Sequence, residues 1–312
     1  MSNKSKKITI IAVLSAIVMV VAGYFALQYY QANTFHYTIK DTLPDGGGKR
    51  AKVILLGGQS NASGCSLDKY LQSNVSEEKY AEYKNGYDNV YINYLSGQNV
   101  SEGFVKCSTV QGELAGAFGP ELGLAEKLHE MYPDETFFII KCAWGGTNLF
   151  DQWLSPSSKG KTGKEYKAFV AFVQNSLDYL ISKNYDIKIE GMCWMQGESD
   201  SISVETATAY SVHLENFVKD IRKNFSKYAA EDGIAFIDAY IAENPAYWVY
   251  YEYVNQGKTR VAGLSPLNSV VDTSELSCSG EPEDQPDIAH YDSLSEIKLG
   301  HLFAQHLDSY ID

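Results

Sequence analysis

Short apolar runs with the composition of buried strands alternate along the chain with longer segments in which apolar residues recur with helical spacing. The strand-like runs are residues 52–56, 89–94, 136–143, 188–195 and 234–241. The helical patterns are residues 119–131, 166–182, 204–225 and 293–310. Strands that alternate with helices are typical of βαβ units. The pattern therefore predicts an α/β fold, in which helices cover both faces of a parallel sheet.

The N-terminal region differs from the rest of the chain. Residues 8–27 form an uncharged, almost wholly apolar run that is about long enough to cross a bilayer as one helix. The basic tail at residues 1–7 keeps this end of the chain in the cytoplasm. We therefore expect a transmembrane signal anchor at 8–27, a polar stalk at 28–50 and one folded domain at 51–312 on the extracytoplasmic side of the membrane.

A cleaved signal peptide is the alternative reading of the same segment. The tripeptide Val21-Ala22-Gly23 offers the small-x-small site that a signal peptidase requires. The domain would then be secreted rather than tethered to the membrane.

The composition narrows the functional classes. The chain has 312 residues, of which 45% are hydrophobic and 21% charged, enough to bury a sizeable core in one large domain or two small ones. The net charge of −13 argues against a nucleic-acid partner, because phosphate binding depends on clustered Lys and Arg. The five cysteines have no C-x-x-C spacing, so we expect no metal site and no cofactor. An exported protein could pair Cys65 with Cys107.

Polar side chains follow the first predicted strand at the point where it ends. The run Gly58-Gln59-Ser60-Asn61 comes directly after the apolar residues of this strand. The carboxyl ends of parallel strands usually open onto a binding crevice. Ser60 is therefore a candidate nucleophile, although a serine between a strand and a helix is also a common N-cap. The two roles are compatible.

A serine nucleophile needs an imidazole base and a carboxylate that orients the imidazole. Of the six histidines, only His290 is expected in a loop that follows the strands. The others are His36 in the stalk and His129, His213, His301 and His306 in helical patterns. Asp287 precedes His290 by three residues, so both side chains can lie on one side of a single turn. A surface turn that caps the last helix is the alternative interpretation of this pair.

Two further loops carry candidate oxyanion donors. Gly145 and Gly146 follow the third strand, and small residues let backbone N–H groups approach a carbonyl oxygen. Gln196 follows the fourth strand and offers a neutral amide donor. Glu198 is the reserve candidate for the carboxylate, with the capping of neighbouring loops as its alternative role. We expect Gln59, Asn61, Trp144 and Glu198 to line the substrate pocket.

In chain order, four blocks resemble the sialate O-acetylesterase-like family, which belongs with carbohydrate esterase family six in the SGNH hydrolase superfamily. The blocks are Gly58-Gln59-Ser60-Asn61, Trp144-Gly145-Gly146-Thr147, Trp194-Met195-Gln196-Gly197-Glu198-Ser199-Asp200 and Asp287-Ile288-Ala289-His290. The resemblance spans roughly residues 52–308. It implies a flavodoxin-like three-layer α/β/α sandwich, and it implies removal of acetyl groups from an acetylated carbohydrate without a metal.

The resemblance also assigns roles to residues of this chain. It makes Ser60 the nucleophile, His290 the general base and Asp287 the acid that orients it. The oxyanion hole would consist of the N–H groups of Ser60 and of Gly145 or Gly146, with the Gln196 side chain. Ala62 departs from the family pattern, which often has methionine after the G-Q-S-N block.

Two other functions fit the same residues. A lipase or thioesterase of the same superfamily would have a wide apolar mouth in place of polar loops. A membrane-tethered glycan-binding protein on an inactive hydrolase scaffold belongs to a different class, and the presence of Ser60, Asp287 and His290 weighs against it. The sequence does not select the glycan.

Overall fold

The computed structural model describes residues 35, 37–278, 281–282 and 287–311. The predicted basic tail and signal anchor, and residues 28–34 and 36 of the stalk, lie outside these residues. No helix in the described part of the chain is long and apolar enough to cross a membrane. The chain divides into two compact units, and the second, Tyr37–Asp312, carries the fold described below.

The centre of this unit is an eight-stranded, mostly parallel sheet. Its strand order is β10-β9-β8-β1-β7-β3-β4, with β5 also paired to β3. The parallel strands are β1 (Arg50–Gly58), β3 (Val90–Ser96), β7 (Phe137–Ala143), β8 (Asp186–Met195), β9 (Ala235–Ala239) and β10 (Asn268–Val271). The antiparallel edge consists of β4 (Asn99–Val100) and β5 (Val105–Lys106). A separate two-stranded ribbon pairs β2 (Ser66–Leu67) with β6 (Ala117–Phe118).

The strand order departs from that of a flavodoxin sheet. Counted along the chain, the parallel strands lie in the order 2-3-1-4-5-6, whereas flavodoxin has 2-1-3-4-5. The difference arises because β7 lies between β1 and β3. The expectation of a flavodoxin-like sheet is therefore met in its class, α/β and mostly parallel with helices on both faces, but not in its strand order.

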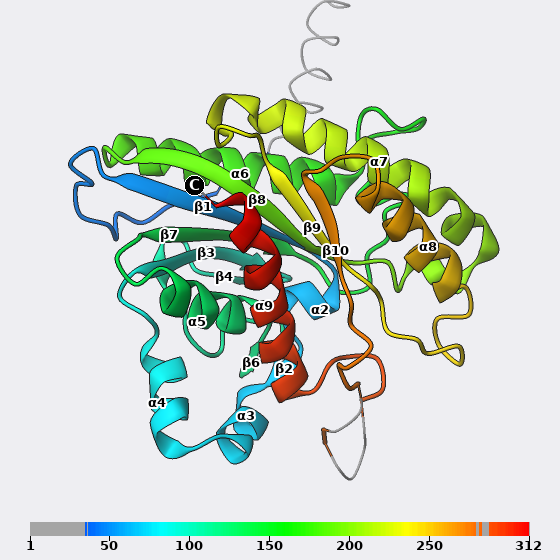
Figure 1. Ribbon diagram of the computed structural model, residues 1–312, viewed down its shortest axis with the longest axis horizontal. Helices are drawn as coiled ribbons and strands as arrows, with labels where there is room; N and C mark the ends of the chain where they lie inside the picture. The colour runs from blue at the N-terminus through cyan, green and yellow to red at the C-terminus, as the bar shows by residue number, and fades with distance from the viewer. Residues whose placement is uncertain (1–34, 36, 279–280, 283–286, 312) are drawn as a thin grey trace, which may run out of the picture. The chain divides into compact units, whose positions relative to one another are not determined.

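Helices cover both faces of the sheet (Figure 1). Helices α5 (Glu121–Met131) and α9 (Ser293–Leu307) lie on one face, and α6 (Lys164–Ser182), α7 (Val204–Phe225) and α8 (Tyr251–Ala262) lie on the other. The remaining helical segments are α2 (Ser60–Ser63), α3 (Asp68–Asn74), α4 (Glu77–Asn85), η1 (Asp200–Ile202), η2 (Ser226–Tyr228) and η3 (Asp308–Tyr310). Because both faces of the central strands are covered, every residue of β7 is buried.

Glycines set the close approach of α5 and α9. A Cβ atom at Gly123 would lie 2.0 Å from the Ile297 carbonyl oxygen, and one at Gly300 would lie 2.2 Å from that of Pro120. Only glycine at these positions lets the two backbones approach so closely. Helix α9 is thereby held on the sheet directly after the segment that contains His290.

All five predicted strands and all four predicted helices are present, with ends that differ by a few residues. The sequence pattern missed the helices α3, α4 and α8, whose apolar positions are few. It also missed the short strands β2, β4, β5, β6 and β10. The suggested pairing of Cys65 with Cys107 is wrong, since the five cysteines are free. Cys107 is buried, and its thiol donates to the Glu121 carbonyl oxygen at 3.3 Å.

The end of the predicted stalk packs against the domain. Leu43 is buried in the main core, and the Thr42 hydroxyl donates to the Phe104 carbonyl oxygen at 2.7 Å. The compact unit begins at Tyr37, ahead of the predicted boundary at residue 51.

Candidate active site

Three of the predicted loops begin at the same level of the sheet. Gly58 of β1 lies opposite Ala143 of β7 and Met195 of β8 in the parallel register. A Cβ atom at Gly58 would lie 1.9 Å from the Met195 carbonyl oxygen, so the turn after β1 requires glycine, here with φ of +142°. The adjacent strand ends bring together the segments that follow them, as the sequence predicted.

Ser60 is the first residue of the short helix α2, directly beyond this turn. Gln59 is the N-cap residue of α2, and only 9% of the Ser60 surface is exposed. Ser60 is therefore not the N-cap, which was the alternative role considered for it. Its hydroxyl belongs to a residue at the carboxyl edge of the central strand, where parallel sheets place their ligands.

The loop before α9 holds the predicted acid and base together. His290 Nδ1 lies 2.6 Å from Asp287 Oδ2, and Asp287 Oδ1 accepts from the N–H groups of Ala289 and His290 at 2.9 and 3.2 Å. Burial acts to raise the pKa of Asp287, but these hydrogen bonds outweigh it, and the pKa lies below its usual value. The ionised carboxylate accepts from Nδ1, which leaves Nε2 of His290 to act as a base.

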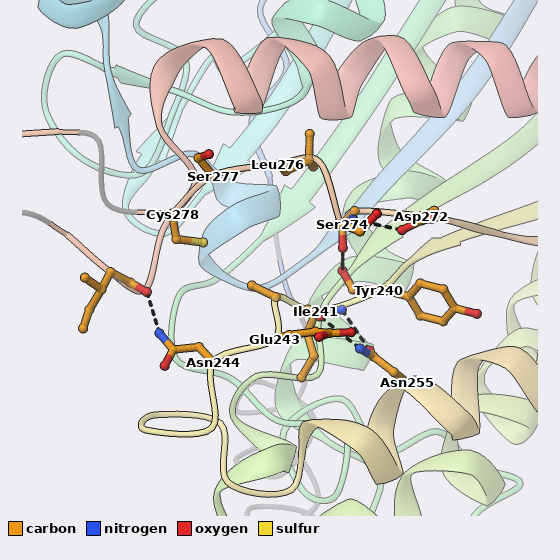
Figure 2. Close-up of a pocket in the computed structure, with 13 residues that line it drawn as sticks. Tyr240, Ile241, Glu243, Asn244, Asn255, Asp272, Ser274, Leu276, Ser277 and Cys278 are labelled. Atoms are coloured by element: carbon orange, nitrogen blue, oxygen red, sulfur yellow. Dashed lines mark hydrogen bonds between the residues drawn. The ribbon is translucent and has the colours of Figure 1, made fainter.

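The same loop is also tied to the strand ends of the other half of the sheet. The Asn244 side chain donates to the Ile288 carbonyl oxygen at 3.2 Å (Figure 2). Asn244 follows β9, so the backbone two residues before His290 is anchored to the segment beyond that strand.

Asn61 joins the segment that contains Ser60 to the loop of residues 287–292, which we call the histidine loop. Asn61 Oδ1 accepts from the Tyr291 N–H at 3.2 Å, and its Nδ2 lies 3.4 Å from the Ala289 carbonyl oxygen. The residue after Ser60 thus bonds to both neighbours of His290. The Ser66 hydroxyl adds a bond of 2.6 Å to the Tyr291 carbonyl oxygen. These contacts join segments that lie 225 to 230 residues apart in the sequence.

Glu198 supports Asn61 rather than His290. Its Oε1 accepts from Asn61 Nδ2 at 2.9 Å. Only 1% of the residue is exposed, and burial raises the pKa of its carboxyl group. Asp287 is the carboxylate on the imidazole, so Glu198 is not needed in that role. Because Asn61 and Glu198 are buried and bonded to each other, we revise the expectation that they line the substrate pocket.

Gln196 directs its amide hydrogens at protein acceptors. The side chain is fully buried, and Nε2 donates to Asp200 Oδ2 at 2.6 Å and to the Thr147 carbonyl oxygen at 3.1 Å. Burial raises the pKa of Asp200 to about 6, against the hydrogen bonds that Leu149, Gln196 and Phe150 donate. We therefore revise the expectation that Gln196 donates to an oxyanion, because its two N–H bonds are shared among three protein acceptors, which belong to Asp200, Thr147 and Gln59.

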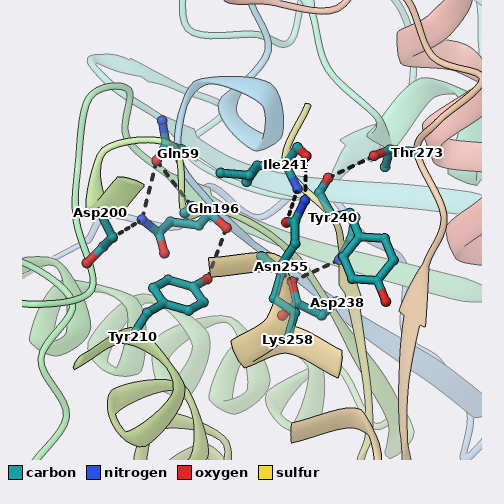
Figure 3. A network of polar contacts seen from close by, with 12 residues as sticks. Gln59, Gln196, Asp200, Tyr210, Asp238, Tyr240, Ile241, Asn255, Lys258 and Thr273 are labelled. Carbon is teal, nitrogen blue, oxygen red and sulfur yellow. Dashed lines mark hydrogen bonds and ion pairs between the residues drawn. The ribbon is translucent and has the colours of Figure 1, made fainter. Parts of the chain in front are cut away.

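Gln59 joins this network through its side-chain oxygen. Its Oε1 accepts from Gln196 Nε2 and Gly197 N–H at 3.3 Å and from Ser199 N–H at 3.2 Å. Figure 3 shows the Gln59 nitrogen pointing away from this network. Three donors on the oxygen fix the orientation of the amide, and its NH₂ group makes no hydrogen bond to the described residues.

The two glycines that were candidate donors, Gly145 and Gly146 in the loop after β7, differ in whether their N–H groups are already bonded. The Gly145 N–H donates to Glu113 Oε2 at 2.8 Å, and the Ser63 hydroxyl donates to the same oxygen at 2.5 Å. Gly146 is exposed, has φ of +69° and keeps its N–H free of partners among the described residues. Of the two glycines, Gly146 therefore fits the donor role. Glu113 was not anticipated, because it lies about fifty residues from Ser63 in a segment without strand or helix periodicity.

Trp144 precedes these glycines and is half-buried. Its backbone N–H donates to the Gly58 carbonyl oxygen at 3.2 Å, and its ring packs on Trp153 with centroids 5.5 Å apart. The indole thus has one face in the core, and its other side is partly accessible beside the strand ends. The described residues contain no group of three or more His, Cys, Asp or Glu side chains that could hold a metal ion.

Comparisons with known proteins identify the family of this chain. The profile of the family described as "Carbohydrate esterase, sialic acid-specific acetylesterase" matches residues 50–309. A search of curated proteins found no match.

Solved structures share the fold at low sequence identity. NanS is 15% identical, with a TM-score of 0.62, over 86% of this chain and 98% of its own. A protein of Arabidopsis thaliana is 16% identical, with a TM-score of 0.60, over 86% of this chain and all of its own. A carbohydrate acetylesterase from Xanthomonas citri is 16% identical, with a TM-score of 0.58, over 83% of this chain and 56% of its own. Since the family profile covers nearly the whole compact unit, the chain belongs to this family of carbohydrate acetylesterases and is a carboxylic ester hydrolase.

Proposed function

We propose that the protein is a serine esterase that removes O-acetyl groups from a carbohydrate through an acetyl-enzyme intermediate. The observation that carries this proposal is the position of Asn61. It follows Ser60 directly and bonds to both neighbours of His290, whose ring nitrogen is held by Asp287. A hydroxyl, an imidazole and an orienting carboxylate are the three groups that nucleophilic serine catalysis needs.

In the proposed reaction, Ser60 Oγ attacks the acetyl carbonyl carbon while His290 Nε2 takes the hydroxyl proton. The tetrahedral intermediate collapses, the bond to the sugar oxygen breaks, and His290 returns the proton to that oxygen. Water then attacks the acetyl-serine in the same way and releases acetate. Asp287 stabilises the imidazolium form of His290 in both halves of the cycle.

The oxyanion of each tetrahedral intermediate needs donors that are already oriented. We assign this role to the N–H groups of Ser60 and Gly146 and to the side-chain NH₂ of Gln59. The assignment is supported by the amide of Gln59, which is fixed by three donors on its oxygen. It is also supported by Gly146, which comes directly after the N–H that Glu113 occupies.

Removal of the Ser60 hydroxyl tests the proposal. Ser60→Ala should lower kcat on an aryl acetate by roughly 10⁴-fold or more, because members of a catalytic triad act as one unit. A fluorophosphonate probe should label Ser60 in the parent protein and nothing in the variant. Ser182→Ala, at the exposed end of α6, is the matched control and should react normally. Near-normal hydrolysis by Ser60→Ala would exclude the mechanism.

The acyl preference separates the proposal from its rivals. An acetylesterase should hydrolyse aryl acetates faster than esters of long acids, whereas a lipase or thioesterase should show the reverse order. A glycan-binding protein without activity would hydrolyse none of them and would not react with the probe.

We also propose that the hydrolase acts outside the cytoplasm, tethered by residues 8–27 or secreted after cleavage near residue 23. The basis is the sequence pattern of a basic tail followed by an apolar run. Protease treatment of intact cells that produce the full chain should digest the catalytic domain if it is tethered outside.

A further inference from the structure

A polar hollow lies beside the histidine loop. It has a volume of about 440 Å³, within the range of about 300–1,000 Å³ that is usual for small-molecule sites. Segments 240–244 and 272–278, which follow β9 and β10, form most of its wall (Figure 2). Asn255 of α8 and Ile288 complete it. None of these residues takes part in the proposed chemistry.

A short run of contacts connects the hollow to the nucleophile. Ile288 lines the hollow and accepts from Asn244 at 3.2 Å. The next residue, Ala289, lies 3.4 Å from Asn61 Nδ2, through its carbonyl oxygen. Asn61 follows Ser60, so this run of contacts joins the wall of the hollow to the proposed nucleophile.

The wall combines apolar side chains with exposed polar groups. Ile241, Leu276 and Ile288 are its apolar part. The Asn255 amide is committed, because it pairs with both the N–H and the carbonyl oxygen of Ile241 at 3.0 Å. The polar groups that remain are on the exposed residues Glu243, Asp272, Ser274 and Ser277. Carboxylates and hydroxyls accept hydrogen bonds from a hydroxyl-rich ligand such as a sugar.

The charge in the hollow has one sign. Its lining includes Glu243 and Asp272 and, in the part of the chain that the structure describes, neither Lys nor Arg. Lys258, one helical turn beyond Asn255, is fully buried and paired with Asp238 at 2.6 Å. Lys298 pairs with Glu275, which does not line the hollow, at 2.5 Å. A ligand carboxylate in the hollow would therefore face two like charges with no compensating cation.

The smaller hollow next to His290 has the same sign. Glu281 and Asp287 line it, and its described lining also lacks Lys and Arg. Tyr70 also lines it, and the Lys69 Nζ lies 4.7 Å from the centroid of the Tyr70 ring. Both spaces that border the histidine loop are thus acidic at their walls.

We propose that the hollow after β9 and β10 binds a sugar unit of the substrate, and that this unit is uncharged rather than a sialic or uronic acid. The proposal rests on the proposed esterase function and adds the substrate class to it. Hydroxyl groups of the sugar would donate to Glu243 and Asp272, and its apolar face would pack on Leu276 and Ile288, which are partly exposed. The acidic wall would repel a sugar that carries a carboxylate.

A matched pair of substrates tests the charge preference. One is an O-acetylated methyl glucoside, and the other is the equally acetylated methyl glucuronide, which differs only in its carboxylate. We expect the wild-type protein to have the higher kcat/KM for the glucoside. Glu243→Gln with Asp272→Asn should narrow this preference by roughly three- to tenfold, mainly through a lower KM for the glucuronide. Asn at position 272 keeps the oxygen that accepts from the Ser274 N–H at 2.9 Å.

The matched control removes two charges elsewhere. Glu231→Gln with Asp232→Asn changes the net charge equally, at two exposed residues that precede β9 at the opposite edge of the sheet. The control should keep the wild-type preference. High salt should narrow the preference of the wild-type protein and have less effect on the Glu243→Gln, Asp272→Asn variant, because ions screen exposed charges.

The possible results separate the two proposals. A wild-type preference for the glucuronide, or for an O-acetylated sialic acid over the glucoside, would overturn the inference and leave the esterase function intact. An unchanged preference in the Glu243→Gln, Asp272→Asn variant would also overturn it. If the wild-type protein does not hydrolyse aryl acetates, or if Ser60→Ala still hydrolyses them at a near-normal rate, the proposed function is rejected, and the inference with it.

Discussion

The candidate site has a buried side and a partly exposed side, and the segment Gly58-Gln59-Ser60-Asn61 connects them. On one side, Gln59 reaches a fully buried network at the end of β8, which includes Gln196 and Asp200 (Figure 3). On the other side, Asn61 reaches a half-exposed loop that contains Asp287 and His290. Ser60 lies between the two amides. One side of Ser60, the proposed nucleophile, is therefore fixed by the core and the other by a surface loop.

This difference matches what each side would do in the proposed reaction. An oxyanion donor acts best when it cannot reorient, and a buried amide with three donors on its oxygen meets that need. The base must accept a proton, turn toward the leaving group and admit substrate, so its loop has to remain accessible. Asn61 connects the rigid side to the accessible side. Its amide donates to buried Glu198, and this bond fixes the side chain that contacts Ala289 and Tyr291 of the loop.

The largest effect should come from the buried side. Gln59→Ala should lower kcat by roughly 10²–10³-fold, because it deletes the proposed oxyanion donor. Gln196→Ala should lower kcat less but reduce the free energy of unfolding by about 1–3 kcal/mol, because it removes the side-chain donor to buried Asp200 and leaves the Thr147 carbonyl oxygen without the amide that donates to it. Steady-state kinetics and urea unfolding of both variants measure the two effects. A larger loss of kcat in Gln196→Ala would restore Gln196 as the donor.

A smaller effect is expected when the accessible side is loosened. Asn61→Ala removes the bonds to Ala289 and Tyr291 and should lower kcat/KM by about tenfold to a hundredfold, because the base is no longer held in place. Amide hydrogen exchange should accelerate in residues 287–292 and stay unchanged in β8.

Asn74→Ala is the matched control for this variant. Asn74 is an exposed asparagine that bonds to Glu281 and Ser293, on the same segment of chain, but makes no hydrogen bond to the described residues 287–292. It should leave kcat/KM near the wild-type value. If both variants, or neither, slow the reaction, Asn61 is not the residue that positions the histidine loop.

The same contrast explains which features could be predicted from the sequence. The strands were predictable because burial on both faces leaves continuous apolar runs, and the edge at which Ser60 lies follows from the parallel order. The pair Asp287 and His290 was predictable because its spacing is local. These features depend on the periodicity or on neighbours within one turn.

The assignment of donors was not predictable in this way. Gln196 and Gly145 have the right residue types at the right strand ends, but Asp200 and Glu113 occupy their N–H groups. Glu113 comes from a loop that only the tertiary fold brings to Gly145. The sequence identifies which residues reach the crevice, whereas the hydrogen bonds decide which donors are still available to a ligand.

The smallest expected effect concerns stability. The contributions of Asp200 and Asp287 to the free energy of unfolding should change with pH in opposite directions. Asp200 has a pKa of about 6 when folded, raised by burial from 3.8, so between these values the folded state holds a proton that the unfolded state has lost. Its contribution to stability is present below about pH 4 and declines as the pH rises toward 6. Wild-type protein should therefore lose stability relative to Asp200→Asn over this range, by about 2 kcal/mol.

Asp287 should show the opposite sign, since its folded pKa lies below 3.8. Its contribution is present above that value and is lost as the pH falls through the lower folded pKa, so wild-type protein should lose stability relative to Asp287→Asn on acidification. Urea unfolding of the wild-type protein and both variants, from pH 3 to pH 7, gives the two differences directly. Parallel profiles for the two variants would show that burial and hydrogen bonding do not separate the two sides of the site as described.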